Sequence, residues 1–435
     1  MSFKKNQKKV INGWCLYDWA NSVYTLTISS TIFPVYYNQM TRGAFNGDLV
    51  TFFGFEIENT VLYSYSLSFS FLVIVLIAPI LSGIADYGGM KKTMMKVFTF
   101  IGAFSCIALY FFNGKNIEWG ITFCMLASLG WAGSLVFYNA FLPEIATEDR
   151  FDTISAKGFA MGYIGSVLQL VASLVILMKP EWFGIESETF PAKFSFLTVG
   201  IWWIVFSQIS FYFLPSNVHE RKINKDHIFK KGFNELKKVY YQVQKNNSIK
   251  RYLIAFFFYN SGVQTVMLLA ATFGEKALSL NADNLILTIL IIQLVAIPGA
   301  YLFAKISEWK GNRFSLMVMV IVWIFACLDA YILQTHNEFY ILAFFVGLVM
   351  GGIQSLSRST YSKLIPEDTI DTASYFSFYD VTEKTSIVIG TFSYGAIEQL
   401  TGNMRNSALF LVLFFTIGLY FLYTFKMKQQ RSLAV

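Results

Sequence analysis

Long apolar segments recur along the whole chain and are separated by short polar breaks. Each apolar segment has roughly 20 residues, the length of helix that crosses a hydrocarbon core about 30 Å thick. The runs are continuous rather than alternating, which favours helices over the strands of a membrane barrel. We therefore predict an all-α membrane protein with twelve spans. They lie near residues 13–38, 60–84, 95–113, 119–141, 156–179, 194–215, 251–275, 284–305, 315–334, 339–362, 375–400 and 406–426.

Composition supports lipid as the surrounding solvent. Of the 435 residues 55% are hydrophobic and only 14% are charged, whereas soluble domains carry about 25% charged residues. The first apolar segment follows a basic stretch, as in a signal peptide, but it is too long for one and lacks a clear cleavage site. We interpret it as a retained span.

The basic residues are distributed unevenly between the two sides of the predicted membrane. The termini, the central polar break and the short loops on the same side hold almost all of the 34 Lys and Arg residues. The exceptions are Arg42, Lys115, Lys179, Lys193, Lys276 and Arg405. Because cytoplasmic loops are enriched in Lys and Arg, both termini are predicted to be cytoplasmic, in a bacterial inner membrane. The charge of +7 thus reflects topology, and nucleic-acid binding is not expected.

The two sets of six spans are similar in sequence. An acid, a glycine three residues later and a base five residues later follow both the second and the eighth span. The fourth and tenth spans both end with Pro-Glu, and the first and seventh both hold Asn-Ser. We therefore predict a parallel repeat: a six-helix bundle in 1–215, a cytoplasmic basic linker with an amphipathic helix in 216–250, and a second bundle in 251–435.

The loop after the second span resembles the signature of the major facilitator superfamily, G-x-L-A-D-R-x-G-R-K. Residues 82–92 match it, with departures at Ser82, Tyr87 and Met90. The resemblance implies a charge latch in which Asp86 meets the N-terminus of a neighbouring helix and a nearby lysine pairs with it. The expected latch residues in the two repeats are Asp86, Gly89, Lys91 and Lys92, and Glu308, Gly311 and Arg313.

Four further segments resemble the vacuole-effluxer (autophagy-related permease) branch of that superfamily. They are WCLYDWANS at 14–22, GFAMGYIG at 158–165, GGIQSLSRS at 351–359 and VTEKTS at 381–386. Members of this branch commonly have glycine where Glu383 stands, so no role for Glu383 is inherited. The resemblance implies export of amino acids or similar small solutes.

Polar residues inside spans are the candidates for substrate binding, because an ionisable group in lipid costs at least about 2.5 kcal/mol. Asp18 and Asn21 share one helical face, as do Gln354 and Arg358. Arginine suits a carboxylate or phosphate of a solute, but it also suits an internal acid, and Asp18, Asp380 and Glu383 are all open as that partner. An acid in the first span also suits a Lys or Arg at the cytoplasmic interface. The expected substrate-binding residues are Asp18, Asn21, Asn260, Gln264, Gln354 and Arg358.

The eleventh span holds a charged cluster of Asp380, Glu383 and Lys384. Lys384 lies four residues after Asp380, so the two side chains can pair along one helical face. Such a cluster either relays protons or stabilises the bundle as a salt bridge. The proton-coupling candidates are Asp18, Asp380 and Glu383.

No metal site or cofactor is expected. The four cysteines lie singly in separate apolar segments without a ligand spacing, and no Walker A pattern suggests direct use of ATP. An enzyme is disfavoured because the three histidines fall in predicted loops. We therefore expect a monomeric secondary transporter in the lipid bilayer that exports a small polar solute by alternating access. A lipid or lysolipid translocator and a non-transporting membrane sensor remain alternatives.

Overall fold

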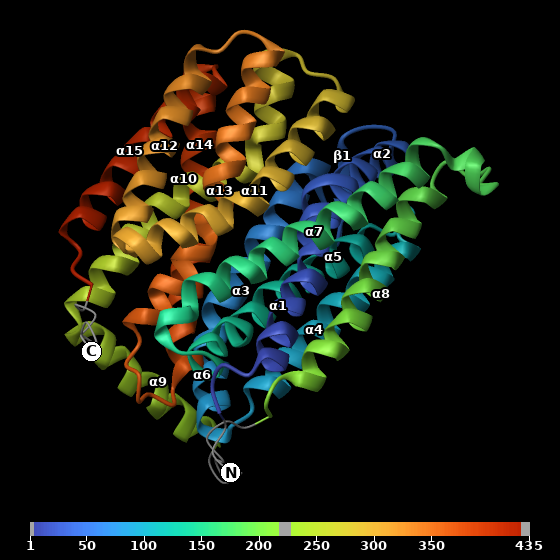
Figure 1. Cartoon of the computed structure of the whole chain (residues 1–435). Coiled ribbons are helices and arrows are strands. Elements are labelled where there is room, and N and C mark those ends of the chain that lie inside the picture. The colour runs from blue at the N-terminus through green and yellow to red at the C-terminus, as the bar shows by residue number, and fades with distance from the viewer. Residues whose placement is uncertain (1–3, 217–227, 428–435) are drawn as a thin grey trace.

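The computed structural model describes residues 4–216 and 228–427, and nearly all of them are helical (Figure 1). The helices before the central break form the first half of the molecule. The spans of this half are α1 (Lys8–Val23) with η1 (Tyr24–Ile32) and α2 (Phe33–Phe45), then α3 (Asn59–Gly88), α4 (Lys91–Ala108), α5 (Ile117–Ala140), α7 (Phe151–Met178) and α8 (Phe190–Phe213). Its short elements are β1 (Leu49–Phe52), β2 (Phe55–Glu58), η2 (Leu109–Phe111), α6 (Leu142–Ile145), η3 (Glu148–Arg150) and η4 (Pro180–Phe183).

The helices after the break form the second half. They are α10 (Asn247–Leu278), α11 (Ala282–Lys310), α12 (Asn312–Ile332), α13 (His336–Leu364), α14 (Thr372–Thr401) and α15 (Met404–Thr424). The two halves lie side by side and contact each other through α3 with α14 and through α7 with α11 and α13. We call the end of the molecule where α1 begins and α15 ends the terminal end (Figure 1).

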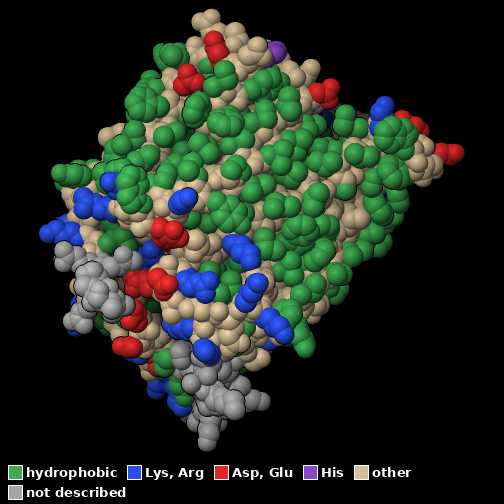
Figure 2. Space-filling view, viewed as in Figure 1, with side chains coloured by type: hydrophobic (Ala, Val, Ile, Leu, Met, Phe, Trp, Pro, Cys, Tyr) green, Lys and Arg blue, Asp and Glu red, His purple; other side chains and the backbone are tan. Residues whose placement is uncertain are grey.

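The predicted twelve-helix membrane fold is confirmed. Ten of the described helices are long and apolar enough to cross a membrane by length and composition alone. The two remaining spans depart from that pattern for local reasons: the first is interrupted by the π-helical turns of η1, and α14 carries the charged cluster. Figure 2 shows a broad hydrophobic band across the visible face of the molecule, with Lys and Arg gathered towards the terminal end.

Two features differ from the sequence-based expectation. Antiparallel strands β1 and β2 form a small hairpin between the first two spans, where no strand was predicted. The amphipathic helix expected within 219–250 is α9 (Ile228–Lys245), whereas residues 219–227 lie outside the described part. Instead of resting on lipid alone, α9 packs on α3 and α14, and it buries Val239 and Val243 while Phe233 stays exposed.

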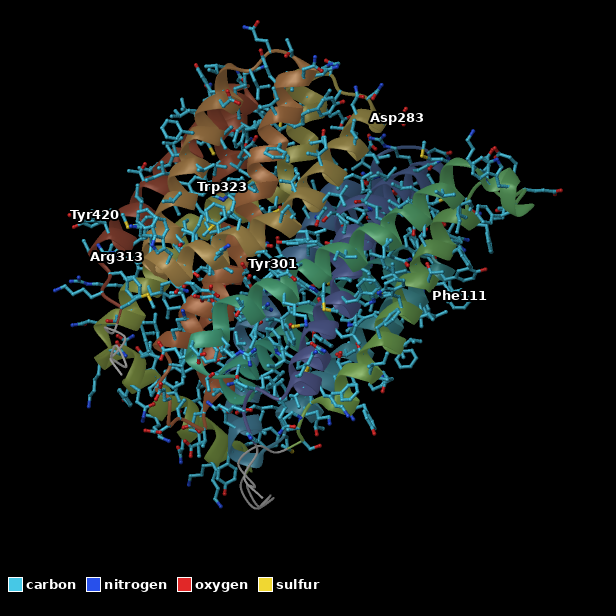
Figure 3. The ribbon with its side chains drawn as sticks, in the orientation of Figure 1. Phe111, Asp283, Tyr301, Arg313, Trp323 and Tyr420 are labelled. Atoms are coloured by element: carbon cyan, nitrogen blue, oxygen red, sulfur yellow. The ribbon has the colours of Figure 1, made fainter. Side chains whose placement is uncertain are left out.

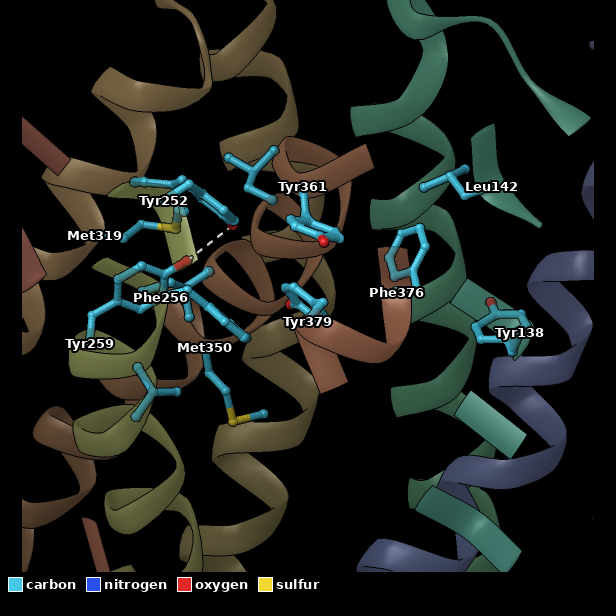
Figure 4. Packing of buried hydrophobic residues seen from close by; sticks show 14 of the residues in the cluster. Tyr138, Leu142, Tyr252, Phe256, Tyr259, Met319, Met350, Tyr361, Phe376 and Tyr379 are labelled. Atoms are coloured by element: carbon cyan, nitrogen blue, oxygen red, sulfur yellow. Dashed lines mark hydrogen bonds between the residues drawn. The ribbon is translucent and has the colours of Figure 1, made fainter. Parts of the chain in front are cut away.

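Close helix crossings depend on glycine. A Cβ atom at Gly351 would lie 2.0 Å from the carbonyl oxygen of Ala296, so α11 and α13 approach each other at backbone contact distance. The other side of α13 is fixed by aromatic packing with α10 and α14 (Figure 4). There Tyr252 donates to the carbonyl of Ser357 over 2.7 Å, and Tyr259 lies 2.7 Å from the hydroxyl of Ser357. These contacts hold the turn of α13 that presents the next residue, Arg358.

Candidate functional site

A cavity of about 270 Å³ lies between the two halves. Every residue predicted to bind substrate lines it, together with Glu383 from the charged cluster. The polar lining residues used below are Asp18, Asn21, Ser22, Asn139, Tyr163, Asn260, Gln264, Gln354, Arg358 and Glu383. Most of the remaining lining is apolar, as is usual for small-molecule sites.

Asp18 and Arg358 form an ion pair across the two halves. Both terminal nitrogens of the guanidinium lie 3.2 Å from Oδ2 of Asp18. The Tyr138 hydroxyl donates to the same oxygen over 2.7 Å. Asp18 and Arg358 are 4% and 3% exposed, so the pair lies in a low-dielectric environment where charge-assisted hydrogen bonds are strong.

Arg358 has further partners that leave it little freedom. Its Nε donates to the Ser155 hydroxyl over 2.9 Å, and one terminal nitrogen donates to the Ser155 carbonyl over 3.0 Å. The guanidinium also lies 4.2 Å from the ring centre of Phe159 and 4.6 Å from that of Trp14, within the range of cation–π attraction. In this conformation Arg358 is therefore committed to internal partners.

The ion pair fits between the helices because residue 158 is a glycine and has no side chain. A Cβ atom there would lie 2.4 Å from Oδ2 of Asp18 and 3.0 Å from a terminal nitrogen of Arg358. One turn later, a Cβ atom at Gly162 would lie 2.6 Å from the hydroxyl of Ser22. The glycines of the 158–165 segment thus let α7 approach α1 at the depth of the cavity.

The amide side chains differ in how well they are satisfied. Asn260 donates to the Ser386 hydroxyl over 2.7 Å, and Gln264 donates to Asn260 over 3.4 Å. Gln354 accepts a hydrogen bond from the hydroxyl of Tyr163. By contrast, the side-chain nitrogen of Asn21 is buried and has no hydrogen-bond partner among the described residues.

On α14 one ammonium group serves two carboxylates. Lys384 lies 2.7 Å from Oε2 of Glu383 and 3.4 Å from Oδ1 of Asp380. The ammonium also lies 4.9 Å from the ring centre of Trp131 in the first half. Glu383, the immediate neighbour of Lys384, thus joins the pair that the helical spacing predicts between Asp380 and Lys384. Glu383 lines the cavity and its side chain is 22% exposed, whereas that of Asp380 is 2% exposed.

Asp86 links the two halves near the terminal end of the molecule. Its carboxylate accepts hydrogen bonds from the backbone N–H of Ala373 at 3.2 Å and of Ser374 at 2.7 Å, in the first turn of α14. Lys91 lies 3.3 Å from Asp86, binds Glu144, and donates to the Thr372 hydroxyl over 2.6 Å. Asp86 therefore lies at the N-terminus of a helix from the opposite half.

A second closing contact uses residues that sequence reasoning missed. Asp152, at the start of α7, accepts hydrogen bonds from Ser307 at 2.9 Å, Asn312 at 2.7 Å and Lys363 at 2.7 Å. The internal repeat could have pointed to Asp152. The sequence offset between Asp86 and Glu308 equals that between Asp152 and Ser374, so Asp152 is the repeat counterpart of the residue that contacts Asp86. In both contacts the acid belongs to the first half and the hydroxyl to the second.

Glu308 and Arg313, the residues expected to form a second latch, form no hydrogen bond or ion pair with each other or with the first half within the described part of the chain. Glu308 is exposed and makes no hydrogen bond or ion pair within residues 4–216 and 228–427. Arg313 donates to the carbonyls of Leu422 and Tyr423 at the end of α15, and Figure 3 shows it at the edge of the second half, away from the first. Lys92 likewise donates to the carbonyl of Leu214 over 2.7 Å, just after α8.

Two latch glycines permit the tight loops. Gly89 has φ +64° and Gly311 has φ +83°, a backbone region that is costly for residues with a side chain. In each half the glycine lets the chain turn from one span into the next. Lys91, after Gly89, is then buried, whereas Arg313, after Gly311, stays at the edge of its half. Gly89 and Gly311 therefore contribute through the backbone conformation of the two loops.

Comparison with known proteins agrees with this architecture. The crystal structure of the human organic anion transporter MFSD10 has a TM-score of 0.73 at 10% identity and covers 96% of this chain and 100% of that one. The fucose:proton symporter FucP of E. coli has a TM-score of 0.69 at 12% identity and covers 97% and 98%. At such low identity these likenesses show the major facilitator fold alone.

Sequence relatives extend over the same length. An uncharacterized MFS-type transporter of Bacillus subtilis, YxiO, is 30% identical over 96% of this chain and 95% of its own. Autophagy-related protein 22 of Saccharomyces cerevisiae is 22% identical over 98% and 93%. These relatives are transporters or transporter-like proteins rather than enzymes. Residues 6–434 match the family described as "Vacuole effluxer Atg22 like". The chain is therefore a multi-pass membrane protein and a secondary transporter of the major facilitator fold, and it belongs to the Atg22-like vacuole effluxer family.

Proposed function

We propose that this transporter exports a small polar solute, such as an amino acid, through the cavity between the halves by alternating access. In this proposal Asp18, Asn21, Asn260, Gln264, Gln354 and Arg358 contact the solute during the cycle. The solute is small because the cavity holds about 270 Å³. The chain acts as a monomer, since one chain supplies both halves of the cavity.

The observation that carries the proposal is the ion pair between Asp18 and Arg358. It joins α1 of the first half to α13 of the second at the cavity wall. A polar solute that approaches either residue competes with this pair. Because the pair spans the halves, its exchange for solute contacts couples binding to their relative movement.

The closing contacts at the terminal end define the state of access. Asp86 and Asp152 both link the halves there, and the terminal end carries most of the basic side chains in Figure 2. By the excess of Lys and Arg in cytoplasmic loops, we place the terminal end in the cytoplasm of a bacterial inner membrane. The described conformation is then closed towards the cytoplasm, and Asp86 and Lys91 act as its latch.

The acids within the span region are suited to coupling transport to protons. Asp18, Asp380 and Glu383 all lie within the span region and all contact a basic side chain. A carboxylate that loses its basic partner during the cycle would take up a proton, because a lone buried charge is costly. Export as the direction rests on the effluxer description of the family.

The test is flux in proteoliposomes with an imposed pH gradient and pools of radiolabelled amino acids. We expect counterflow by the wild type, and loss of at least about 10-fold in Asp18→Asn and Arg358→Ala, since each breaks the ion pair. Glu398→Gln, on the outer part of α14 and paired only with Lys276 at 3.0 Å among described residues, is the matched control.

Three other results would overturn the proposal in different ways. Full flux in both cavity variants would exclude the proposed site. Movement of labelled lysolipid without movement of amino acids would favour a lipid translocator. No flux of any solute, in protein that is folded and correctly inserted, would favour a sensor.

A further inference from the structure

We infer that the solute carries a net positive charge as a protonated amine, and that Glu383 selects it. This inference rests on the proposed function, because it assumes that a small solute enters the cavity. It goes further by naming the charge of the solute and the residue that recognises it.

The charge of the cavity wall is unbalanced. Among the described lining residues, the Asp, Glu, Lys and Arg side chains are Asp18, Arg358 and Glu383. Asp18 and Arg358 neutralise each other through two contacts of 3.2 Å. The carboxylate of Glu383 is therefore the remaining charge that a solute in the cavity meets.

One ammonium group does not cancel the two carboxylates of the cluster to which Glu383 belongs. Lys384 is shared between Glu383 at 2.7 Å and Asp380 at 3.4 Å, so the three side chains together carry one excess negative charge when both acids are ionised. Both carboxylate oxygens of Asp380 lack a hydrogen bond among the described residues. Burying an unbalanced charge is costly, and a cation that binds Glu383 from the cavity removes the imbalance.

An independent feature indicates what else the solute offers. The side-chain nitrogen of Asn21 is buried, lines the cavity and has no partner in the described part of the chain. A buried donor without an acceptor costs free energy, so a bound solute with a hydrogen-bond acceptor is favoured here. A neutral acceptor, such as an amide carbonyl or a hydroxyl, fits better than a carboxylate because Arg358 is already occupied by Asp18.

The rest of the wall favours an apolar body. Met350, Ile353 and Ile387 line the cavity on α13 and α14, close in sequence to Arg358 and Glu383. A solute with an ammonium group, a neutral acceptor and a short apolar side chain would match Glu383, Asn21 and these residues respectively. This chemistry describes an amine without a free carboxylate.

The experiment keeps the side chain of the ligand fixed and varies the charges of its amino and carboxyl groups. The ligands are the C-terminal amide, the free amino acid and the N-acetyl amino acid of alanine, leucine and phenylalanine, which are cationic, zwitterionic and anionic. Binding to the purified full-length protein is measured by isothermal titration calorimetry. We expect the amide to bind at least about 10-fold more tightly than the free amino acid for the preferred side chain, the factor that corresponds to one modest electrostatic contact.

Two variants assign this preference to Glu383. Glu383→Gln leaves Lys384 paired with Asp380, so the cluster stays balanced, and we expect the preference for the amide to fall to within about 2-fold. Glu398→Gln makes the same change of charge on the same helix and is expected to retain the preference, because it lies next to Lys276 and outside the described cavity lining.

The outcomes separate this inference from the proposed function. Tighter binding of the free amino acid than of its amide, with flux of that amino acid, overturns the inference and leaves the proposed function intact. An unchanged preference in folded Glu383→Gln overturns the role of Glu383. If none of the ligands binds, both the inference and the proposed cavity are wrong.

Discussion

Both terminal nitrogens of Arg358 contact the same oxygen of Asp18, a residue 340 positions earlier in the chain. The contact lies at the cavity wall and joins the two halves of the molecule. Tyr138 adds a third donor to that oxygen. The same group of atoms therefore stabilises this conformation and must be rearranged when the halves move.

Removing one member of this pair should destabilise the protein more than removing both. In Arg358→Gln the buried carboxylate of Asp18 loses its cation, which costs about 3–5 kcal/mol. The double variant Asp18→Asn/Arg358→Gln leaves no lone charge, so part of the loss should be recovered. Thermal unfolding of the detergent-purified proteins provides the double-mutant cycle. Simple additivity of the two single changes would contradict the pairing.

Gly158→Ala should disrupt the same pair without changing any charge. The new methyl group would lie 2.4 Å from Asp18 Oδ2, so either the carboxylate or α7 must shift. We expect a fall in melting temperature and a loss of flux. Gly395→Ala is the matched control, because a Cβ atom there has nothing within 4 Å and alanine favours the helix. Equal effects of the two changes would exclude the close contact as the cause.

Asp86→Asn and Asp152→Asn should each open the terminal end more often. Each change weakens carboxylate contacts with the opposite half, such as those to Ser374 and Asn312. Cys15 is fully buried against α7 and reports this opening. In a background without the other cysteines, we expect a water-soluble thiol reagent to label Cys15 several-fold faster in either variant.

Glu308→Gln is the discriminating comparison for this labelling experiment. The loop signature assigns Glu308 to a latch, whereas the structure leaves it exposed and unbonded among the described residues. The structure therefore predicts the wild-type labelling rate. Faster labelling in Glu308→Gln, with no change in Asp152→Asn, would favour the sequence-based assignment.

The contact between Lys238 and Asp371 should hold α9 against α14. The two groups lie 2.8 Å apart, and the hydrogen bond to Asp371 raises the pKa of Lys238 above 10.5. A raised lysine pKa stabilises the folded state below the unfolded pKa, and this contribution is lost as pH rises through the folded value. Because half of the Lys238 side chain is exposed, the effect should be small, about 0.2–1 kcal/mol.

Hydrogen exchange of the α9 amides measures this effect. In Lys238→Met we expect modestly faster exchange, and in the wild type we expect docking of α9 to vary little across neutral and mildly alkaline pH. Lys237→Met, next to Lys238 but without an ion pair among described residues, serves as control. The same acceleration in both variants would show that the ion pair is not the cause.

Sequence patterns predicted the spans well, because hydropathy reports directly on the solvent around each helix. They also singled out Arg358 and the amides that line the cavity, since polar groups inside apolar runs stand out. Asp86 was singled out by the loop signature instead. They did not reveal the partner of Arg358, which comes from a distant helix, and Asp18, Asp380 and Glu383 were equally plausible. Asp152 was missed because it lies at the start of a span, where an acid is ordinary.

The two contacts that close the terminal end are asymmetric. Their carboxylates, Asp86 and Asp152, both belong to the first half, while Ser374, Asn312 and Lys363 donate from the second. Two copies of the first half placed face to face would set acid against acid at this seam. If the repeat arose by duplication of an ancestral six-helix subunit, the two descendants have since become obligate and non-interchangeable partners.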